Sequence, residues 1–145
     1  MQWTELKKRV NGRLIQPANP IQPCIDHQSG ESCAVILQNL NNPYFIEDES
    51  GATQSTGWFG AWNSTPSVYA VAAENTHDVA AAVEFARKHR LRLVIKGTGH
   101  DYLGRSCAPD SLLIWTHRMA AMCKVGFFEG SIVRSRQHHE NYHDS

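Results

Sequence analysis

Hydrophobic and polar positions follow regular patterns only in the middle of the chain. Residues 67–73 combine β-branched, aromatic and small side chains, which predicts a short strand. Asn75 or Thr76 then provides the N-cap of a helix, and Asp78 in its first turn suits the helix dipole. Apolar residues recur in this helix at i, i+3, i+4 and i+7. They predict one buried stripe made of Val79, Ala82, Val83 and Ala86.

Two further strands are predicted after this helix. Residues 91–95 follow it almost at once, and residues 111–116 follow the turn signal Pro109-Asp110. A strand, a helix and a strand joined by short connections form a βαβ unit, in which the strands run parallel. The loop after residue 95 therefore leaves the carboxyl end of a parallel strand. We predict an α+β fold with a small βαβ-containing sheet.

Both flanks of this segment lack a clear period. Residues 11–66 are rich in Asn, Pro, Gln, Ser and Gly, which predicts a loop-rich lead-in without long elements. A first helix is expected at residues 2–10, whereas residues 34–40 allow a helical turn, a strand or an extended segment. Residues 131–145 are polar and predict disorder. The expected division is a lead-in at 1–66, a partial domain at 67–118 and an atypical tail at 119–145.

Composition limits the partners of the chain. Its 145 residues suffice for one domain with a core. The 14 basic residues balance 14 acidic ones, so no net field attracts nucleic acid or an anionic membrane. No apolar run approaches the ~20 residues that a membrane span needs, and the pattern is that of a soluble chain. We therefore expect neither nucleic acid nor a membrane as a partner.

The sequence points to two different compartments. Residues 1–10 include basic side chains but no apolar segment follows them, so they are no secretory signal as written and favour a cytoplasmic protein. The glycosylation acceptor Asn63-Ser64-Thr65 and an even number of cysteines favour secretion. Cys24 and Cys33 could pair with each other or with another partner. Four free thiols are the alternative for Cys24, Cys33, Cys107 and Cys123.

The loop after the second predicted strand, residues 96–106, holds the candidate chemistry. Gly97, Gly99 and Gly104 permit positive φ angles and a close approach of the backbone to a ligand. Successive amide N–H groups can then converge on an anion such as a pyrophosphate. His100 adds a nucleophile or base directly after the second glycine.

Common nucleotide motifs do not describe this loop. A Rossmann fingerprint follows the first strand of its unit and opens a helix, whereas this loop follows the second strand. A P-loop requires Gly-Lys-Ser/Thr, which is absent here. For the glycines alone, an ordinary tight turn is the alternative.

The order, spacing and identity of these segments resemble the first half of a PCMH-type FAD-binding domain. The domain is that of the vanillyl-alcohol oxidase and berberine-bridge-enzyme superfamily, in a fungal-type branch. The similar region runs from about Pro66 to Arg118, and the lead-in around Asn11-Gly12-Arg13-Leu14 and Pro23-Cys24 is also similar to that branch. The segments that carry the resemblance are residues 66–73, 78–87, 91–106 and 112–117.

This resemblance implies FAD as the cofactor. It implies that the loop amides hold the FAD pyrophosphate and that His100 is bonded covalently to a methyl carbon of the isoalloxazine ring. A neutral imidazole nitrogen is nucleophilic enough near pH ~7 for such a bond. Tyr102 and Leu103 are expected as apolar neighbours and Arg105 as a charge partner. The expected cofactor-binding residues are Lys96, Gly97, Thr98, Gly99, His100, Asp101, Tyr102, Leu103, Gly104, Arg105 and Ser106.

The chain also departs from the family. Gly97 stands where this branch often has Asn, which loosens the loop and removes a side-chain amide. The family's enzymes are several times longer, and their substrate domain has no counterpart here, so no catalytic residue is assigned. The family-like sequence is expected to stop near His117, as a misread intron or a frameshift would produce.

The resemblance implies a flavin-dependent oxidoreductase. In complete relatives a hydride passes from an alcohol or a similar small organic substrate to FAD, and dioxygen takes the electrons. The short chain is expected to be an inactive FAD-binding fragment, and the resemblance favours an extracellular location. A non-enzymatic interaction protein and a flavin-free phosphate- or nucleotide-binding module are the alternatives.

No metal site is predicted. The tail histidines, His138, His139 and His143, lack partner carboxylates at ligand spacing. Cys107 is expected to be a buried or incidental thiol, because the cysteine anchor of bicovalent relatives lies far downstream of the histidine. Surface or packing roles are expected for His27, His77, His89 and His117.

Overall fold

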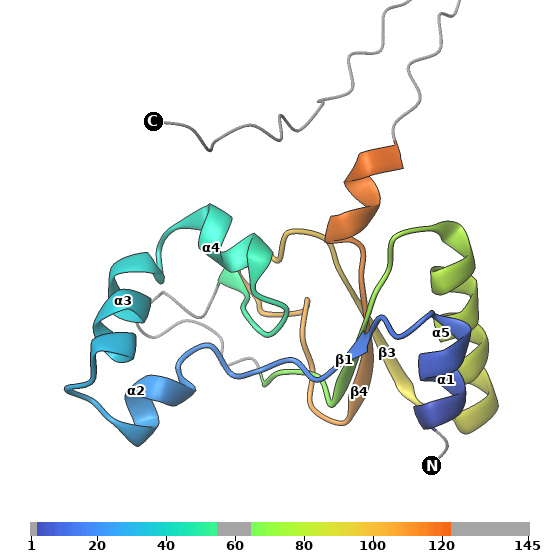
Figure 1. Cartoon of the computed structure of the whole chain (residues 1–145), viewed down its shortest axis with the longest axis horizontal. Coiled ribbons are helices and arrows are strands. Elements are labelled where there is room, and N and C mark those ends of the chain that lie inside the picture. The colour runs from blue at the N-terminus through green and yellow to red at the C-terminus, as the bar shows by residue number, and fades with distance from the viewer. Residues whose placement is uncertain (1–2, 55–64, 123–145) are drawn as a thin grey trace, which may run out of the picture.

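A computed structural model describes residues 3–54 and 65–122 of the chain (Figure 1). A four-stranded sheet lies at its centre, with the strands in the order β1-β2-β4-β3. Strand β2 pairs with β4, and β4 with β3, in parallel, whereas β1 pairs antiparallel with β2. The predicted α+β fold is confirmed. The strands are β1 (Leu14–Ile15), β2 (Tyr69–Ala72), β3 (Arg92–Lys96) and β4 (Ser111–Trp115).

Helix α5 (Thr76–His89) connects β2 to β3, as predicted, but these two strands are not neighbours. Strand β4 lies between them, and Ile114 is level with Val71 on one side and Ile95 on the other. Every residue of β4 is buried, which explains its central position, since the central strand of a parallel sheet loses most contact with water. The loop after β3 therefore starts at the sheet edge, at the carboxyl ends of the parallel strands.

Helix α5 begins at the predicted cap, because the Asn75 side chain accepts a hydrogen bond of 3.0 Å from the Asp78 N–H. The predicted buried stripe was wrong at Val83, whose side chain is 44% exposed. The sheet instead covers a face shifted by about one position, because Phe85 packs into the core and Asp78 is held from the other side. The buried residues are Asp78, Ala81, Ala82, Phe85 and Ala86.

Asp78 is more than a partner of the helix dipole. Its carboxylate accepts two hydrogen bonds from Arg13, from Nε at 3.0 Å and from Nη2 at 2.7 Å. Burial raises the pKa of Asp78, but the hydrogen bonds from Arg13 and from the Glu74 backbone outweigh it and hold the pKa below its ordinary value. This ion pair ties the start of α5 to the segment just before β1.

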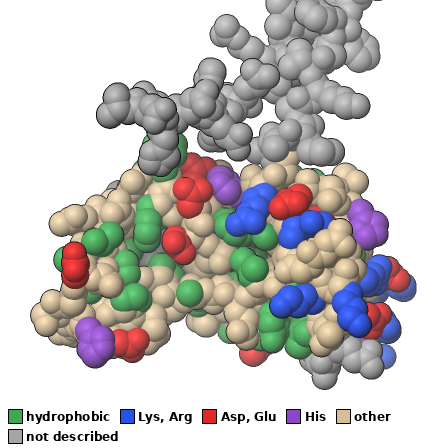
Figure 2. Space-filling view, in the orientation of Figure 1, with side chains coloured by type: hydrophobic (Ala, Val, Ile, Leu, Met, Phe, Trp, Pro, Cys, Tyr) green, Lys and Arg blue, Asp and Glu red, His purple; other side chains and the backbone are tan. Residues whose placement is uncertain are grey.

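Helix α1 (Trp3–Arg9) confirms the helix predicted at the start of the chain. Its Leu6 is fully buried in the core on the α5 side of the sheet, and the Trp3 ring lies 5.2 Å from the Phe85 ring. Arg9 pairs with Glu84 across the two helices. Basic and acidic side chains are intermingled over this side of the molecule (Figure 2).

The lead-in consists of short elements, as predicted. They are α2 (Gln22–Asp26), α3 (Glu31–Asn39) and α4 (Pro43–Asp48). Of the conformations open to residues 34–40, the helix is the one formed. A disulfide joins Cys24 in α2 to Cys33 in α3, one of the pairings that the sequence allowed. These helices lie across the sheet from α1 and α5 (Figure 1).

Some predictions fall on other parts of the chain. Asn63 and Ser64 of the glycosylation acceptor, Cys123 and the tail histidines lie outside the described residues. The predicted disorder of residues 131–145 also lies outside them. Among the described helices none is long and apolar enough to cross a membrane. The domain division stays a prediction.

Candidate functional site

The glycine loop begins where β3 ends. Thr116, just after β4, donates to the Lys96 carbonyl from its backbone N–H at 2.8 Å and from Oγ1 at 3.2 Å. These bonds hold the first residue of the loop against the end of the central strand. Ligands of open α/β sheets bind outside the carboxyl ends of the strands, and the loop lies at that end.

The glycines of the loop have different roles. Gly99 and Gly104 have positive φ angles of 85° and 67°, whereas Gly97 does not. A Cβ at Gly99 would lie 2.6 Å from the Lys96 Cε and 3.2 Å from the Ala52 carbonyl oxygen. The nearest atom to a Cβ at Gly97 is 3.9 Å away, so a side chain fits there. Only glycine suits position 99, while position 97 is open to larger residues.

Open backbone amides lie in the first part of the loop. Gly97, Thr98 and His100 are exposed, and their N–H groups donate to no acceptor among the described residues. In the second part the N–H groups are used locally, since Gly104 donates to the Asp101 carbonyl and Arg105 to the Asp101 carboxylate. The open N–H groups are the donors that could hold an anion.

The Lys96 side chain turns away from the loop surface and is fully buried. Its Nζ donates to the carbonyls of Glu49 and, at 3.3 Å, of Ile46, and it lies 5.7 Å from the Trp115 ring centroid. Burial lowers the pKa of Lys96 to about 8. The ammonium group therefore joins the loop to the end of α4, and its charge lies beneath the loop.

His100 is exposed and has one described hydrogen-bond partner on its ring. Its Nδ1 lies 3.2 Å from Oε1 of Gln54, a side chain that is 8% exposed. The Gln54 backbone N–H also donates to the Gly99 carbonyl at 2.8 Å. The sequence reasoning did not identify Gln54, because it lies 46 residues before His100 and belongs to no motif.

Arg105, the predicted charge partner, is paired within the loop. Its Nε and Nη2 donate to the two carboxylate oxygens of Asp101 at 2.9 and 2.8 Å. Hydrogen bonds from Arg105 hold the pKa of Asp101 well below its usual range. The loop therefore presents no unpaired cation, although the Arg105 side chain is 74% exposed. Tyr102 and Leu103 are also exposed, at 60% and 54%.

The residues next to the loop have structural partners. Ser106 is half-buried, and Cys107 is a buried free thiol, as predicted, whose pKa is raised by burial. His117 stacks on Trp115 and lies 3.1 Å from the Asp48 carboxylate, and His89 packs on Phe85. Within residues 3–54 and 65–122, no group of three or more His, Cys, Asp and Glu side chains could hold a metal ion.

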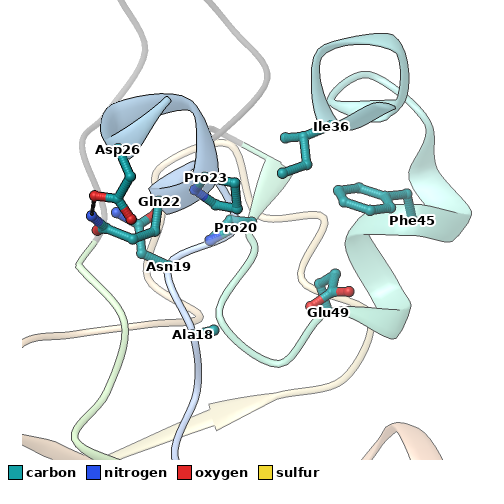
Figure 3. A pocket seen from close by; sticks show the side chains of 9 residues that line it. All are labelled: Ala18, Asn19, Pro20, Gln22, Pro23, Asp26, Ile36, Phe45 and Glu49. Carbon is teal, nitrogen blue, oxygen red and sulfur yellow. Dashed lines mark hydrogen bonds between the residues drawn. The ribbon is translucent and has the colours of Figure 1, made fainter. Parts of the chain in front are cut away.

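An apolar groove in the lead-in is a separate feature. It has a volume of about 350 Å³, and Pro23, Ile36 and Phe45 line it from three short helices (Figure 3). A hydrogen bond of 2.8 Å between Gln22 and Asp26 crosses one side of it. None of its lining residues belongs to the glycine loop.

The loop combines two chemical properties. Its open amides suit a phosphate group without a paired cation, because backbone N–H groups supply the positive dipole ends. Directly beside them, His100 presents an exposed imidazole that can act as a nucleophile or a base. A cofactor with both a phosphate group and an electrophilic carbon fits these residues.

Comparisons with known proteins agree with this chemistry. A family described as "FAD binding domain" matches residues 67–126. An FAD-linked oxidoreductase, easE of Trichophyton verrucosum, is 60% identical over 139 residues, which cover 81% of this chain and 23% of the relative. Another, asqF of Emericella nidulans, is 33% identical over 135 residues, which cover 81% of this chain and 24% of the relative.

Solved structures show the same similarity. A VAO-type flavoprotein from Myceliophthora thermophila C1 superposes with a TM-score of 0.67 at 25% identity, and covers 81% of this chain. The match spans 23% of that flavoprotein. The chain thus spans about a quarter of the length of the relatives that it matches.

Proposed function

The chain carries part of the FAD-binding domain of FAD-linked oxidoreductases, and we propose that the loop from Lys96 to Ser106 forms one side of the flavin site. The observation that carries this proposal is the row of open amides at Gly97, Thr98 and His100 beside an exposed imidazole. These amides would bind the pyrophosphate of FAD. Lys96 takes part only as a support, because its side chain is buried beneath the loop.

His100 is proposed as the point of covalent attachment. Its ring is exposed and held on one nitrogen only, so the other nitrogen is available to a methyl carbon of the flavin ring. In the net reaction one hydrogen leaves the methyl carbon and one leaves the imidazole, and both, with two electrons, reduce the ring. Dioxygen reoxidises it. The bond would prevent loss of the cofactor.

The proposed activity belongs to the whole protein. When bound, FAD accepts a hydride from a small organic substrate and passes the electrons to dioxygen. The residues of this chain bind and orient the cofactor, and no described side chain is assigned to the substrate. We also propose secretion, which the Cys24–Cys33 disulfide supports because disulfides persist in oxidising compartments.

A flavin-binding experiment tests the proposal. The chain is produced with excess FAD, freed of unbound flavin, denatured in acid, and its absorbance and mass are measured. We expect flavin absorbance and the added mass of FAD to stay with the denatured protein, and to be lost in His100→Ala. Absence of bound flavin at saturating FAD would contradict the flavin site. Flavin that is bound but fully released by acid would contradict the covalent bond alone.

ADP provides the comparison with a general phosphate-binding module. A flavin site predicts that FAD raises the thermal unfolding midpoint more than ADP does, since the loop amides and His100 are both engaged. Equal stabilisation by the two ligands would favour the flavin-free module.

A further inference from the structure

We infer that Gln54 is a positioning residue for His100. By accepting a hydrogen bond from Nδ1–H, it holds the neutral imidazole in the tautomer whose Nε2 carries the lone pair. Nε2 is then the nitrogen that bonds to the flavin. This inference rests on the proposed function, because it assigns the reactive atom of the same site.

The hydrogen-bond geometry selects this tautomer. The group facing Nδ1 is the amide oxygen of Gln54, at 3.2 Å, and an amide oxygen can only accept. Nδ1 must therefore carry the proton, which leaves Nε2 unprotonated in the neutral ring. Without a partner, histidine favours the opposite tautomer, with the proton on Nε2. Gln54 would therefore reverse the intrinsic preference of the ring.

Gln54 is well anchored for this role. Its backbone N–H is bonded to the carbonyl of Gly99, the residue just before His100, and its side chain is 92% shielded from water, being 8% exposed. The preceding residues, Gly51, Ala52 and Thr53, are all buried. Backbone and side chain thus hold the same two-residue segment, which restricts how the amide and the imidazole can move relative to each other.

A neutral amide also suits the charge change. When Nε2 forms a bond, the ring becomes an imidazolium until Nδ1 releases its proton, and the amide oxygen stabilises this positive charge through the same hydrogen bond. The neighbouring carboxylate of Asp101 is bound to Arg105. Among the described side chains, Gln54 is therefore the group placed to accept the proton-bearing nitrogen of His100.

Nitrogen-15 NMR of the full chain without FAD tests the tautomer directly. The spectrum of the imidazole nitrogens is recorded at about pH 9, where a neutral ring shows one protonated and one unprotonated nitrogen. His100→Ala identifies the His100 signals by their loss. We expect the Nδ1 signal at the upfield, protonated position and the Nε2 signal far downfield. The reverse assignment in the wild type would overturn the inference.

Three variants sharpen the test. Gln54→Leu is expected to move the His100 tautomer toward Nε2–H, whereas Gln54→Glu, which also only accepts, keeps Nδ1–H. Gln38→Leu makes the same chemical change at an exposed site in α3 and should leave the His100 signals unchanged. A circular dichroism spectrum identifies the folded variants. A folded Gln54→Leu variant with an unchanged tautomer would overturn the role of Gln54.

The two proposals fail in different ways. An Nδ1–H tautomer in a chain that never binds FAD would overturn the flavin site and support the role of Gln54 in holding the ring. An Nε2–H tautomer in a chain that still forms the covalent bond would overturn the role of Gln54 and leave the flavin site supported.

Discussion

The two parts of the glycine loop are held in different ways. The first part, Lys96 to His100, is bound by residues 46–54 of the lead-in, through the Lys96 ammonium group, the Gly99 carbonyl and the His100 ring. The second part, Asp101 to Ser106, is bound mainly within itself, through the Asp101–Arg105 pair and the bonds of the Asp101 carboxylate to backbone N–H groups. Distant contacts therefore shape the part that carries the open amides and the imidazole.

This difference separates support from presentation. In the first part the bonded groups lie below the loop, which leaves the N–H groups of exposed residues free of described acceptors. In the second part the N–H groups are used by the loop's own side chain. A ligand site needs the first arrangement, because donors already used by local turns are not available to an anion.

Gly99→Ala should break the first part with the largest effect. The positive φ angle of 85° costs about 1–3 kcal/mol for alanine, and the Cβ would meet the Lys96 side chain at 2.6 Å, which adds about 1–3 kcal/mol of overpacking. We expect the free energy of unfolding in urea to fall by about 2–6 kcal/mol.

Gly97→Ala is the matched control in the same loop. The new Cβ has no atom nearer than 3.9 Å and the φ angle is not positive, so we expect a gain of about 0.4–1 kcal/mol from the reduced freedom of the unfolded chain. Equal losses in the two variants would show that the loop does not distinguish its glycines in the way described.

The buried ammonium group of Lys96 should give the first part a pH dependence. Its pKa is about 8 in the folded chain, below the ordinary value of 10.5, so between these values the unfolded chain binds more protons. The free energy of unfolding should therefore rise with pH across that interval, by at most about 3 kcal/mol. Urea unfolding at a series of pH values measures it.

Lys96→Met keeps the length of the side chain and removes the titrating group. The rise attributed to Lys96 should be absent from this variant, while the contributions of other groups remain in both curves. An identical pH dependence of the wild type and Lys96→Met would exclude Lys96 as its source.

Changes in the second part should have the smallest effect on global stability. Asp101→Ala removes an exposed ion pair and the side-chain acceptor of the Arg105 N–H, so we expect faster hydrogen exchange at that amide and an unchanged unfolding midpoint. Arg105→Ala removes the ion pair but keeps the acceptor. Fast exchange at residue 105 in both variants would mean that the guanidinium, rather than the backbone bond, orders this turn.

Local patterns predicted much of the fold. The three strands of the central segment, the helix with its Asn75 cap and the glycines at 99 and 104 follow from side-chain period, capping and φ preference, which act over a few residues. The buried stripe of α5 was displaced at Val83 because two faces of the helix contain small apolar residues. The packing of Phe85 and the ion pair of Asp78 select between them.

The sequence alone determined where the loop lies along the chain and which residue follows Gly99, and therefore that an imidazole stands beside a flexible anion-binding backbone. Only the tertiary structure decided that β4 enters between β2 and β3, that Lys96 points inward, and that Gln54 faces His100. These contacts join residues 46 to 50 positions apart, and their partners carry no local period or motif. They form only when the lead-in packs against the carboxyl end of the sheet.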